Sequence, residues 1–125
     1  MGEGGYAYFG KIKLDIGWGN GAHSTGDSVV RENYTDPYWH YPYDFNVAEQ
    51  RIWKLYAEPS SRVDIFLGNQ PTGVTVFGYY NAQAQYADLI MENGRYMLWS
   101  FDKGPKSMTD DGQKLFVNTV YRTMQ

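Results

Sequence analysis

The sequence predicts an α+β fold, with a mostly antiparallel sheet followed by one amphipathic C-terminal helix. Three observations predict it: apolar residues alternate with period two in several short segments, Asn93-Gly94 lies between two such segments, and apolar residues recur at helical spacing near the end. Apolar residues make up 42% of the 125 residues and charged residues 20%, a balance typical of a globular chain. We therefore expect a single domain over residues 1–125.

The N-terminal region combines one predicted strand with a glycine-rich loop. Within residues 6–16, apolar and charged residues alternate, as in a strand with one solvated face. Residues 17–21 read Gly-Trp-Gly-Asn-Gly, and a tight loop should follow because glycine permits backbone angles that other residues avoid. The exposed N–H groups of such a loop could cradle an anion. The alternative is an ordinary turn whose polar side chains are satisfied locally.

Residues 22–45 show no sustained period and are dense in aromatic residues and turn formers. Pro37 and Pro42 interrupt any helix or inner strand there. A structureless loop of this length is unusual in a compact domain, so it is either a functional surface loop or a region where the element assignment fails. Its rings offer flat apolar faces with polar edges, which suit sugars or protein interfaces. The alternative is that they cover a small core.

The middle of the chain predicts one ambiguous element and one hairpin. Asn46 could cap a helix over residues 47–58, with Pro59 beyond its end, but a strand fits nearly as well. Residues 63–67 and 74–77 both alternate, and turn formers separate them, so they predict two strands joined as a hairpin.

The last third of the chain predicts a second hairpin and the helix. Asn93-Gly94 is the dipeptide preferred where both central residues of a turn need positive φ, and the arms would be residues 86–92 and 95–101. Ser107 could then cap a helix that runs to residue 124, with Asp110 in the capping-box position. The apolar residues that share one helical face, and should pack on the sheet, are Met108, Leu115, Phe116, Val120 and Met124.

Residues 94–122, which read GRYMLWSFDKGPKSMTDDGQKLFVNTVYR, resemble the C-terminal end of class I glutamine amidotransferase-like domains, especially the ThuA-like branch. In that family a Gly-Arg leads into a buried strand, and a helix with a Gly and a Leu-Phe-Asn type stretch closes the domain. The resemblance implies a divergent three-layer α/β arrangement as the alternative fold. The matching packing and turn residues are Gly94, Arg95, Gly112, Leu115, Phe116 and Asn118.

The chain departs from that family at the positions that carry its chemistry. A working glutaminase of the family uses a cysteine nucleophile, with a His and a Glu after its last core strand. This chain has no cysteine, and after the corresponding strand it reads Ser-Phe-Asp-Lys-Gly-Pro over residues 100–105. The resemblance therefore implies no glutaminase activity. The lack of cysteine also excludes disulfides and thiolate metal sites.

Charge and hydropathy exclude two classes of partner. The net charge is −3 and no cluster of Lys or Arg could neutralise a row of phosphates, so we expect no nucleic acid partner. The apolar runs are far shorter than the roughly 20 residues that cross a bilayer, so we expect no membrane partner. No signal peptide is visible in this chain, and a soluble protein of unknown compartment is expected.

The two histidines are candidates for chemistry. His23 and Asp27 flank a serine as in a nucleophilic triad, but side chains so close in sequence rarely converge. Either His23 or His40 could join Asp27, Asp36 or Asp44 at a metal ion, yet no pair has the spacing of a known zinc or calcium loop. We therefore predict no metal site and no cofactor.

The leading functional hypothesis is a non-catalytic binding or interaction domain. Its aromatic and glycine-rich loops would hold a small polar ligand such as a carbohydrate, or another subunit. Two alternatives stay open: a hydrolase-like enzyme that uses His23 or His40 with a nearby carboxylate, and a structural subunit of a homo-oligomer. The residues predicted to form the ligand-binding or interface surface are Trp18, His23, Asp27, Tyr38, Trp39, His40 and Tyr41.

Overall fold

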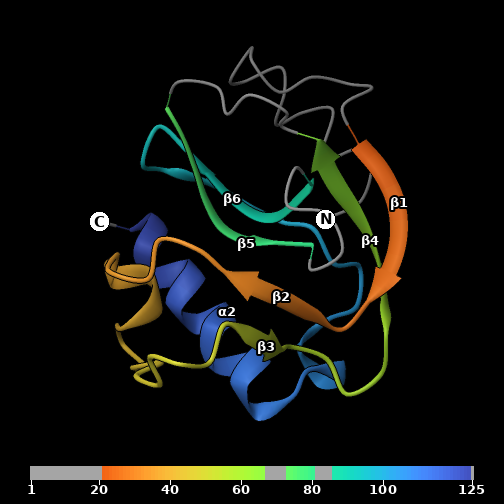
Figure 1. The fold of residues 1–125 in the computed structure, drawn as a ribbon, viewed down its shortest axis with the longest axis horizontal. Helices are drawn as coiled ribbons and strands as arrows, with labels where there is room; N and C mark the ends of the chain where they lie inside the picture. Colours follow the sequence, from red (N-terminus) through yellow and green to blue (C-terminus); the bar gives the residue numbers. More distant parts are fainter. Residues whose placement is uncertain (1–20, 67–72, 81–85, 125) are drawn as a thin grey trace.

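The computed structural model describes residues 21–66, 73–80 and 86–124, with side chains from residue 24 onward. Within these residues, one seven-stranded sheet is accompanied by a single α-helix (Figure 1). This is the predicted α+β fold, a mostly antiparallel sheet with a C-terminal helix, and not the three-layer alternative. The elements are β1 (Gly21–Gly26), β2 (Ser28–Arg31), the 3-10 helix η1 (Pro37–Trp39), β3 (Ile52–Lys54), β4 (Ser60–Phe66), β5 (Val74–Tyr79), β6 (Tyr86–Glu92), β7 (Tyr96–Trp99), the 3-10 helix η2 (Pro105–Ser107) and α2 (Asp110–Thr123).

The sheet curls into a barrel-like ring. The strand order is β1-β4-β6-β5-β2-β3, with β7 also paired to β6, and every pair is antiparallel. Only Asp27 separates β1 from β2. Starting from β1, the successive paired strands are β4, β6, β5 and β2. Because β2 directly follows β1 in the chain, the series begins and ends on the same continuous segment. Closure of this kind reduces the number of free strand edges.

The hairpin around Asn93-Gly94 is confirmed. These two residues join β6 directly to β7, and their φ angles are 53° and 67°. The Arg95 N–H donates to the Glu92 carbonyl at 3.0 Å and closes the turn. Positive φ at both central residues is the requirement that favours this dipeptide.

Three other expectations need correction. The segments 63–67 and 74–77 do contain strands, but their hairpin is wrong because β6 lies between β4 and β5 and pairs with both. The prediction of a helix over residues 47–58 is wrong, and the segment contains the short strand β3 instead. Residues 21–31, where no period was visible, form β1 and β2. The strand expected over residues 6–16 and most of the glycine loop lie outside the described residues.

A buried ionic cluster joins the strands where β1 bends into β2. The side chains of Arg62, Asp64 and Asp88 are at most 3% exposed. Arg62 Nε lies 3.1 Å from Asp64 Oδ1, and Arg62 Nη1 lies 3.4 Å from Asp88 Oδ2. The same guanidinium donates to Ser24 Oγ at 2.9 Å and to the Ser28 carbonyl at 3.1 Å, one residue on each side of the bend. Arg62 thus ties the bend to β4 and β6.

The space around this guanidinium is filled. A Cβ atom at Gly26, the last residue of β1, would lie 2.6 Å from Arg62 Cζ, so a larger residue there would displace the guanidinium. Burial raises the pKa of Asp88 well above its usual range, and its hydrogen bond with Asp64 raises it further, against the opposing charge of Arg62.

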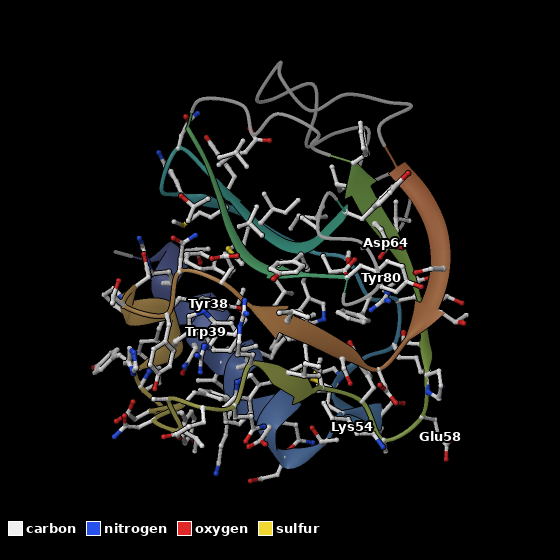
Figure 2. The ribbon with its side chains drawn as sticks, viewed as in Figure 1. Tyr38, Trp39, Lys54, Glu58, Asp64 and Tyr80 are labelled. Atoms are coloured by element: carbon white, nitrogen blue, oxygen red, sulfur yellow. The ribbon has the colours of Figure 1, made fainter. Side chains whose placement is uncertain are left out.

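Two hydrophobic clusters make up the core. The larger one joins α2 to the sheet and includes Trp39, Phe77 and Leu115. The smaller one consists of strand residues alone, Val63 and Ile90 among them. Figure 2 shows Tyr38 and Trp39, which belong to the larger cluster, close to α2.

Helix α2 begins later than predicted. Its N-cap is Thr109, whose hydroxyl accepts a 2.9 Å hydrogen bond from the Gly112 N–H. Ser107 instead ends η2. A Cβ at Gly112 would lie 2.0 Å from the Leu55 carbonyl oxygen, so only glycine lets the helix approach the end of β3 this closely.

The buried face of α2 also differs from the prediction. Leu115 is fully buried and Phe116 is partly buried, but Val120 is 46% and Met124 73% exposed. Asn118, a polar residue outside the predicted apolar face, is fully buried. The Asn118 side chain lies inward because it forms hydrogen bonds with the backbone of Tyr38 and Tyr43 in the aromatic loop after β2.

The position of the buried face predicts unequal effects of truncation along α2. Leu115→Ala should lower the free energy of unfolding by about 2 to 5 kcal/mol, because it leaves a cavity in the larger cluster. Val120→Ala should change it by less than about 0.5 kcal/mol. Urea denaturation of both variants measures the difference, and similar losses would contradict the assigned face.

The buried carboxyl pair predicts a pH dependence of stability. The pKa of Asp88 is higher in the folded protein than in the unfolded chain, where it is about 4. Protonated Asp88 therefore stabilises the folded protein below about pH 4, and this stabilisation is lost as the pH rises through the folded-state pKa. Asp88→Asn should therefore flatten the decline in unfolding free energy above about pH 4. The matched control is Asp102→Asn, at an exposed carboxylate. Denaturant unfolding across the pH range tests this, and equal slopes in wild type and Asp88→Asn would refute it.

Candidate functional site

The aromatic loop after β2 folds against α2. Tyr38 and Trp39 are both 0% exposed, so the prediction that they form a binding surface is wrong. The Tyr38 ring stacks on Phe77 with centroids 4.3 Å apart, and its hydroxyl lies 3.0 Å from Thr119 Oγ1. Trp39 Nε1 donates to the Glu32 carbonyl at 2.8 Å. These rings are part of the core, the alternative that the sequence left open.

Asn118 anchors this loop to the helix. Its amide nitrogen donates to the Tyr38 and Tyr43 carbonyls at 2.9 and 2.8 Å, and its oxygen accepts from the Tyr43 N–H at 3.0 Å. Arg122 adds two contacts to Asp36, at 2.9 and 3.3 Å. Burial raises the pKa of Asp36, but hydrogen bonds from Arg122 and the Tyr38 N–H outweigh it, so the pKa lies below its ordinary value.

His40 has both ring nitrogens engaged inside the loop. Nδ1 lies 2.5 Å from Asp44 Oδ1, and Nε2 lies 2.7 Å from the Tyr34 carbonyl oxygen. Both partners are hydrogen-bond acceptors. The His40 side chain therefore connects two parts of the loop. Tyr41, by contrast, is 55% exposed and packs its ring edge against Tyr121.

The remaining predicted site residues lie elsewhere. Trp18 is outside the described residues, and His23 is described only by its backbone, which pairs with Val63. Asp27 occupies the bend between β1 and β2, where its carboxylate accepts from the Ser28 hydroxyl at 2.6 Å and lies 3.9 Å from Lys54 Nζ. In the part of the chain that is described, no three His, Cys, Asp or Glu residues are grouped so as to hold a metal ion.

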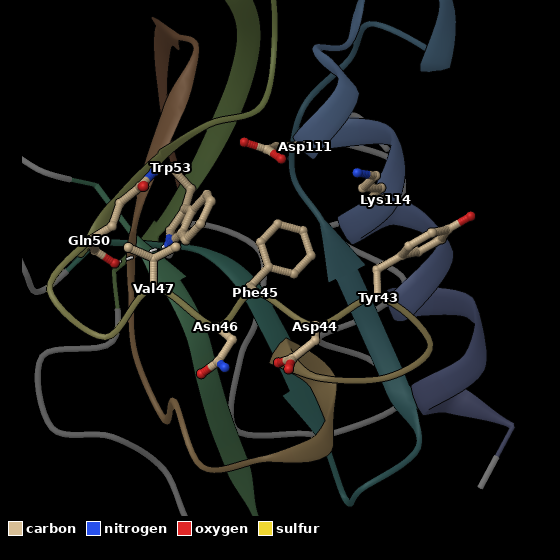
Figure 3. A pocket seen from close by; sticks show the side chains of 9 residues that line it. All are labelled: Tyr43, Asp44, Phe45, Asn46, Val47, Gln50, Trp53, Asp111 and Lys114. Carbon is tan, nitrogen blue, oxygen red and sulfur yellow. Dashed lines mark hydrogen bonds between the residues drawn. The ribbon is translucent and has the colours of Figure 1, made fainter.

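A pocket of about 270 Å³ opens between the end of the aromatic loop, β3 and the first turns of α2. Figure 3 shows Phe45 at its centre, Trp53 and Tyr43 on either side, and Asp111 and Lys114 reaching in from the helix. The residues that line it are Tyr43, Asp44, Phe45, Asn46, Val47, Gln50, Trp53, Asp111 and Lys114.

The aromatic part of the pocket has a fixed geometry. Phe45 and Trp53 meet edge to face, with centroids 5.0 Å apart and planes at 81°. Trp53 Nε1 donates to the Gln50 carbonyl at 3.1 Å, and the Phe45 N–H donates to the Trp39 carbonyl at 2.8 Å. Phe45 and Trp53 are at most 5% exposed, whereas Tyr43 is 43% exposed. The pocket thus combines two buried rings with a third ring that faces solvent.

The polar part of the pocket carries charges that are largely neutralised. Lys114 Nζ lies 3.0 Å from Asp110 Oδ2 and 5.8 Å from the Tyr43 ring centroid. Asp44 is paired with His40. The pocket therefore offers hydrogen-bonding groups from both loop and helix around its rings, together with the Asp111 carboxylate, for which no ion pair is found among the described residues.

Few features of the sequence predicted this pocket. Tyr43, Asp44 and Phe45 lie within the aromatic segment of residues 22–45, but Trp53 lies in the ambiguous segment of residues 47–58, and no pattern marked Asp111 as a site residue. The pocket depends on a contact between segments some 60 residues apart in sequence, which periodicity does not predict.

A scan of the sequence against protein-family models, a search of curated proteins and a search of solved structures found no match. The resemblance to the ThuA-like branch is thus neither supported nor opposed by a known relative. No helix among the described residues is long and apolar enough to span a membrane. The function has to be argued from the pocket and its surroundings.

The packing of the loop predicts different roles for its two neighbouring rings. Trp39→Ala should lower the free energy of unfolding by about 3 to 5 kcal/mol, because it removes a fully buried ring. Tyr41→Ala should cost less than about 1 kcal/mol, since only a surface ring pair is lost. Chemical denaturation measures both. A stable Trp39→Ala protein would show that the loop does not belong to the core.

Proposed function

We propose that this protein is a non-catalytic binding domain that holds a small polar ligand in the pocket lined by residues 43–47, Gln50, Trp53 and the start of α2. The observation that carries the proposal is a single open pocket of about 270 Å³ that combines an aromatic surface with a polar rim. Pockets that recognise small molecules typically join apolar walls to a few placed polar groups.

The chemistry of the rim favours a neutral, hydroxylated ligand such as a carbohydrate. The side chains of Asp44 and Asp111 supply acceptors, while Asn46 and Gln50 supply amide donors and acceptors. The exposed Tyr43 ring suits the apolar face of a sugar ring. An anionic ligand is less well matched, because Lys114 is already paired with Asp110 and the other two charged lining residues, Asp44 and Asp111, are carboxylates.

Preorganisation supports the same proposal. The backbone of Tyr43 is held by Asn118, and the buried edge-to-face pair of Phe45 and Trp53 supports the adjacent wall. A ligand that enters this pocket orders few additional groups, so more of its contact energy appears as affinity.

The other hypotheses have less support. Both ring nitrogens of His40 are engaged in contacts within the loop. The hypothesis of a hydrolase-like enzyme therefore depends on His23, whose side chain is not described. Self-association is a second candidate because three neighbouring side chains near the end of α2 are exposed: Val120 by 46%, Tyr121 by 43% and Met124 by 73%. Light scattering of Tyr121→Ser/Met124→Ser against the unsubstituted protein separates a dimer from a monomer.

The proposal is tested by NMR titration with a panel of neutral monosaccharides, polyols and charged sugar acids. We expect neutral sugars to shift the amide signals of residues 43–50 and 110–114. Tyr43→Ala should weaken their binding about fivefold, because an aromatic contact is worth about 1 kcal/mol. The control is Tyr96→Ala, at a tyrosine on β7 that is also partly exposed.

Two outcomes contradict the proposal. In one, no member of the panel shifts these signals. In the other, binding is detected but responds equally to Tyr43→Ala and Tyr96→Ala, which would place the ligand outside this pocket.

A further inference from the structure

A second cavity lies on the other side of α2. Its volume is about 370 Å³, and Phe116 and Thr119 line it from the helix. Asp111 and Lys114 line the first pocket. Because successive helical residues are about 100° apart, these two pairs flank the buried stripe through Leu115 on opposite sides. The second cavity is therefore separate from the proposed ligand site.

The walls of the second cavity are mostly apolar. The ring centroids of Trp99 and Phe116 are 5.3 Å apart with planes at 80°, and those of Trp99 and Phe101 are 6.2 Å apart. Met97 and Met108 complete the walls. Faces and edges of aromatic rings, together with thioether sulfurs, contact a flat aromatic molecule favourably.

Hydrogen bonds hold one wall and the rim in place. Trp99 Nε1 donates to the Tyr56 hydroxyl at 3.0 Å, and that hydroxyl donates to the Lys103 carbonyl at 2.7 Å. The backbone of Lys103 is further fixed because its N–H donates to Ser60 Oγ at 3.1 Å. The cavity is thus formed by groups that already have defined positions.

The rim carries a local positive charge in a chain whose net charge is −3. Residues 102–107 contain Lys103 and Lys106 but only one acid, Asp102. Asp102 and Lys103 line the cavity, and Lys106 follows in η2. Both lysines are exposed, and neither ammonium group is paired with a carboxylate among the described residues. This segment therefore favours an anionic group over a cationic one.

We propose that the cavity binds a small aromatic carboxylate. The aromatic ring lies among Trp99, Phe116 and the methionines, and the carboxylate points toward the Lys103 ammonium group at the rim. The available volume of about 370 Å³ is ample for one or two fused rings, since an apolar cavity of about 150 Å³ already holds benzene. This inference does not depend on the function proposed for the first pocket.

The test compares three probes of one shape: 1-naphthoate, 1-naphthalenemethanol and 1-naphthylmethylamine. Calorimetry measures affinity, and NOEs locate the bound ring against the methyl groups of Met97 and Met108. We expect 1-naphthoate to bind about threefold to fivefold more tightly than the alcohol, as one exposed ion pair allows, and the amine to bind least. Added salt should reduce the advantage of the carboxylate.

Two substitutions separate the ring contacts from the charge contact. Lys103→Gln should reduce the affinity for 1-naphthoate to that for the alcohol, while Lys54→Gln, at an exposed lysine on β3, should leave it unchanged. Met97→Trp should weaken all three probes at least about tenfold by filling the cavity. NOEs in the unsubstituted protein decide the location if Met97→Trp does not fold.

The proposal is overturned if none of the probes binds, if the amine binds more tightly than the carboxylate, or if the NOEs place the ring elsewhere. Equal effects of Lys103→Gln and Lys54→Gln would also overturn the assigned carboxylate contact. None of these results bears on sugar binding in the first pocket.

Discussion

The three hydrogen bonds of the buried Asn118 side chain determine how the aromatic loop is arranged against α2. They join α2 to the Tyr38 and Tyr43 backbone, 80 and 75 residues earlier in the chain. With the loop fixed at these points, Tyr38 and Trp39 turn into the core while Tyr43 stays at the surface beside Lys114. A buried amide with all these partners is stabilising, whereas an unsatisfied one would be costly. The first pocket exists because this anchor holds its loop in one position.

The sheet and the helix contribute to the same small core through different interactions. On the sheet, Arg62 pairs with the buried carboxyl groups of Asp64 and Asp88 and donates hydrogen bonds to residues on both sides of the bend between β1 and β2. On the helix, Gly112 allows contact with the end of β3, and the side chains on either side of the buried stripe are left to line two cavities. The packing that stabilises α2 thus also separates a polar pocket from an apolar one, which is why two different ligand classes are proposed.

Sequence patterns within a few residues predicted the elements that depend on interactions between near neighbours in the chain. The fold class, the Asn93-Gly94 turn and the existence of the C-terminal helix followed from turn geometry and periodicity. The order of strands did not, because β6 inserts between β4 and β5 through contacts that no spacing shows. The aromatic run was singled out correctly as unusual, but exposure was inferred for Trp39, which is buried. Rings are placed inside or outside by distant partners such as Asn118, and a single sequence does not reveal them.

The central claim is that the loop before the first pocket is a rigid part of the core, anchored by Asn118. Native-state hydrogen exchange of the Tyr43 and Phe45 amides tests it most directly, because these N–H groups donate to Asn118 Oδ1 and to the Trp39 carbonyl. The account predicts that both amides exchange with an opening free energy close to that of the β6 amides, through global unfolding. Exchange of the Tyr43 amide at the rate of an unstructured peptide, while β6 stays protected, would contradict it.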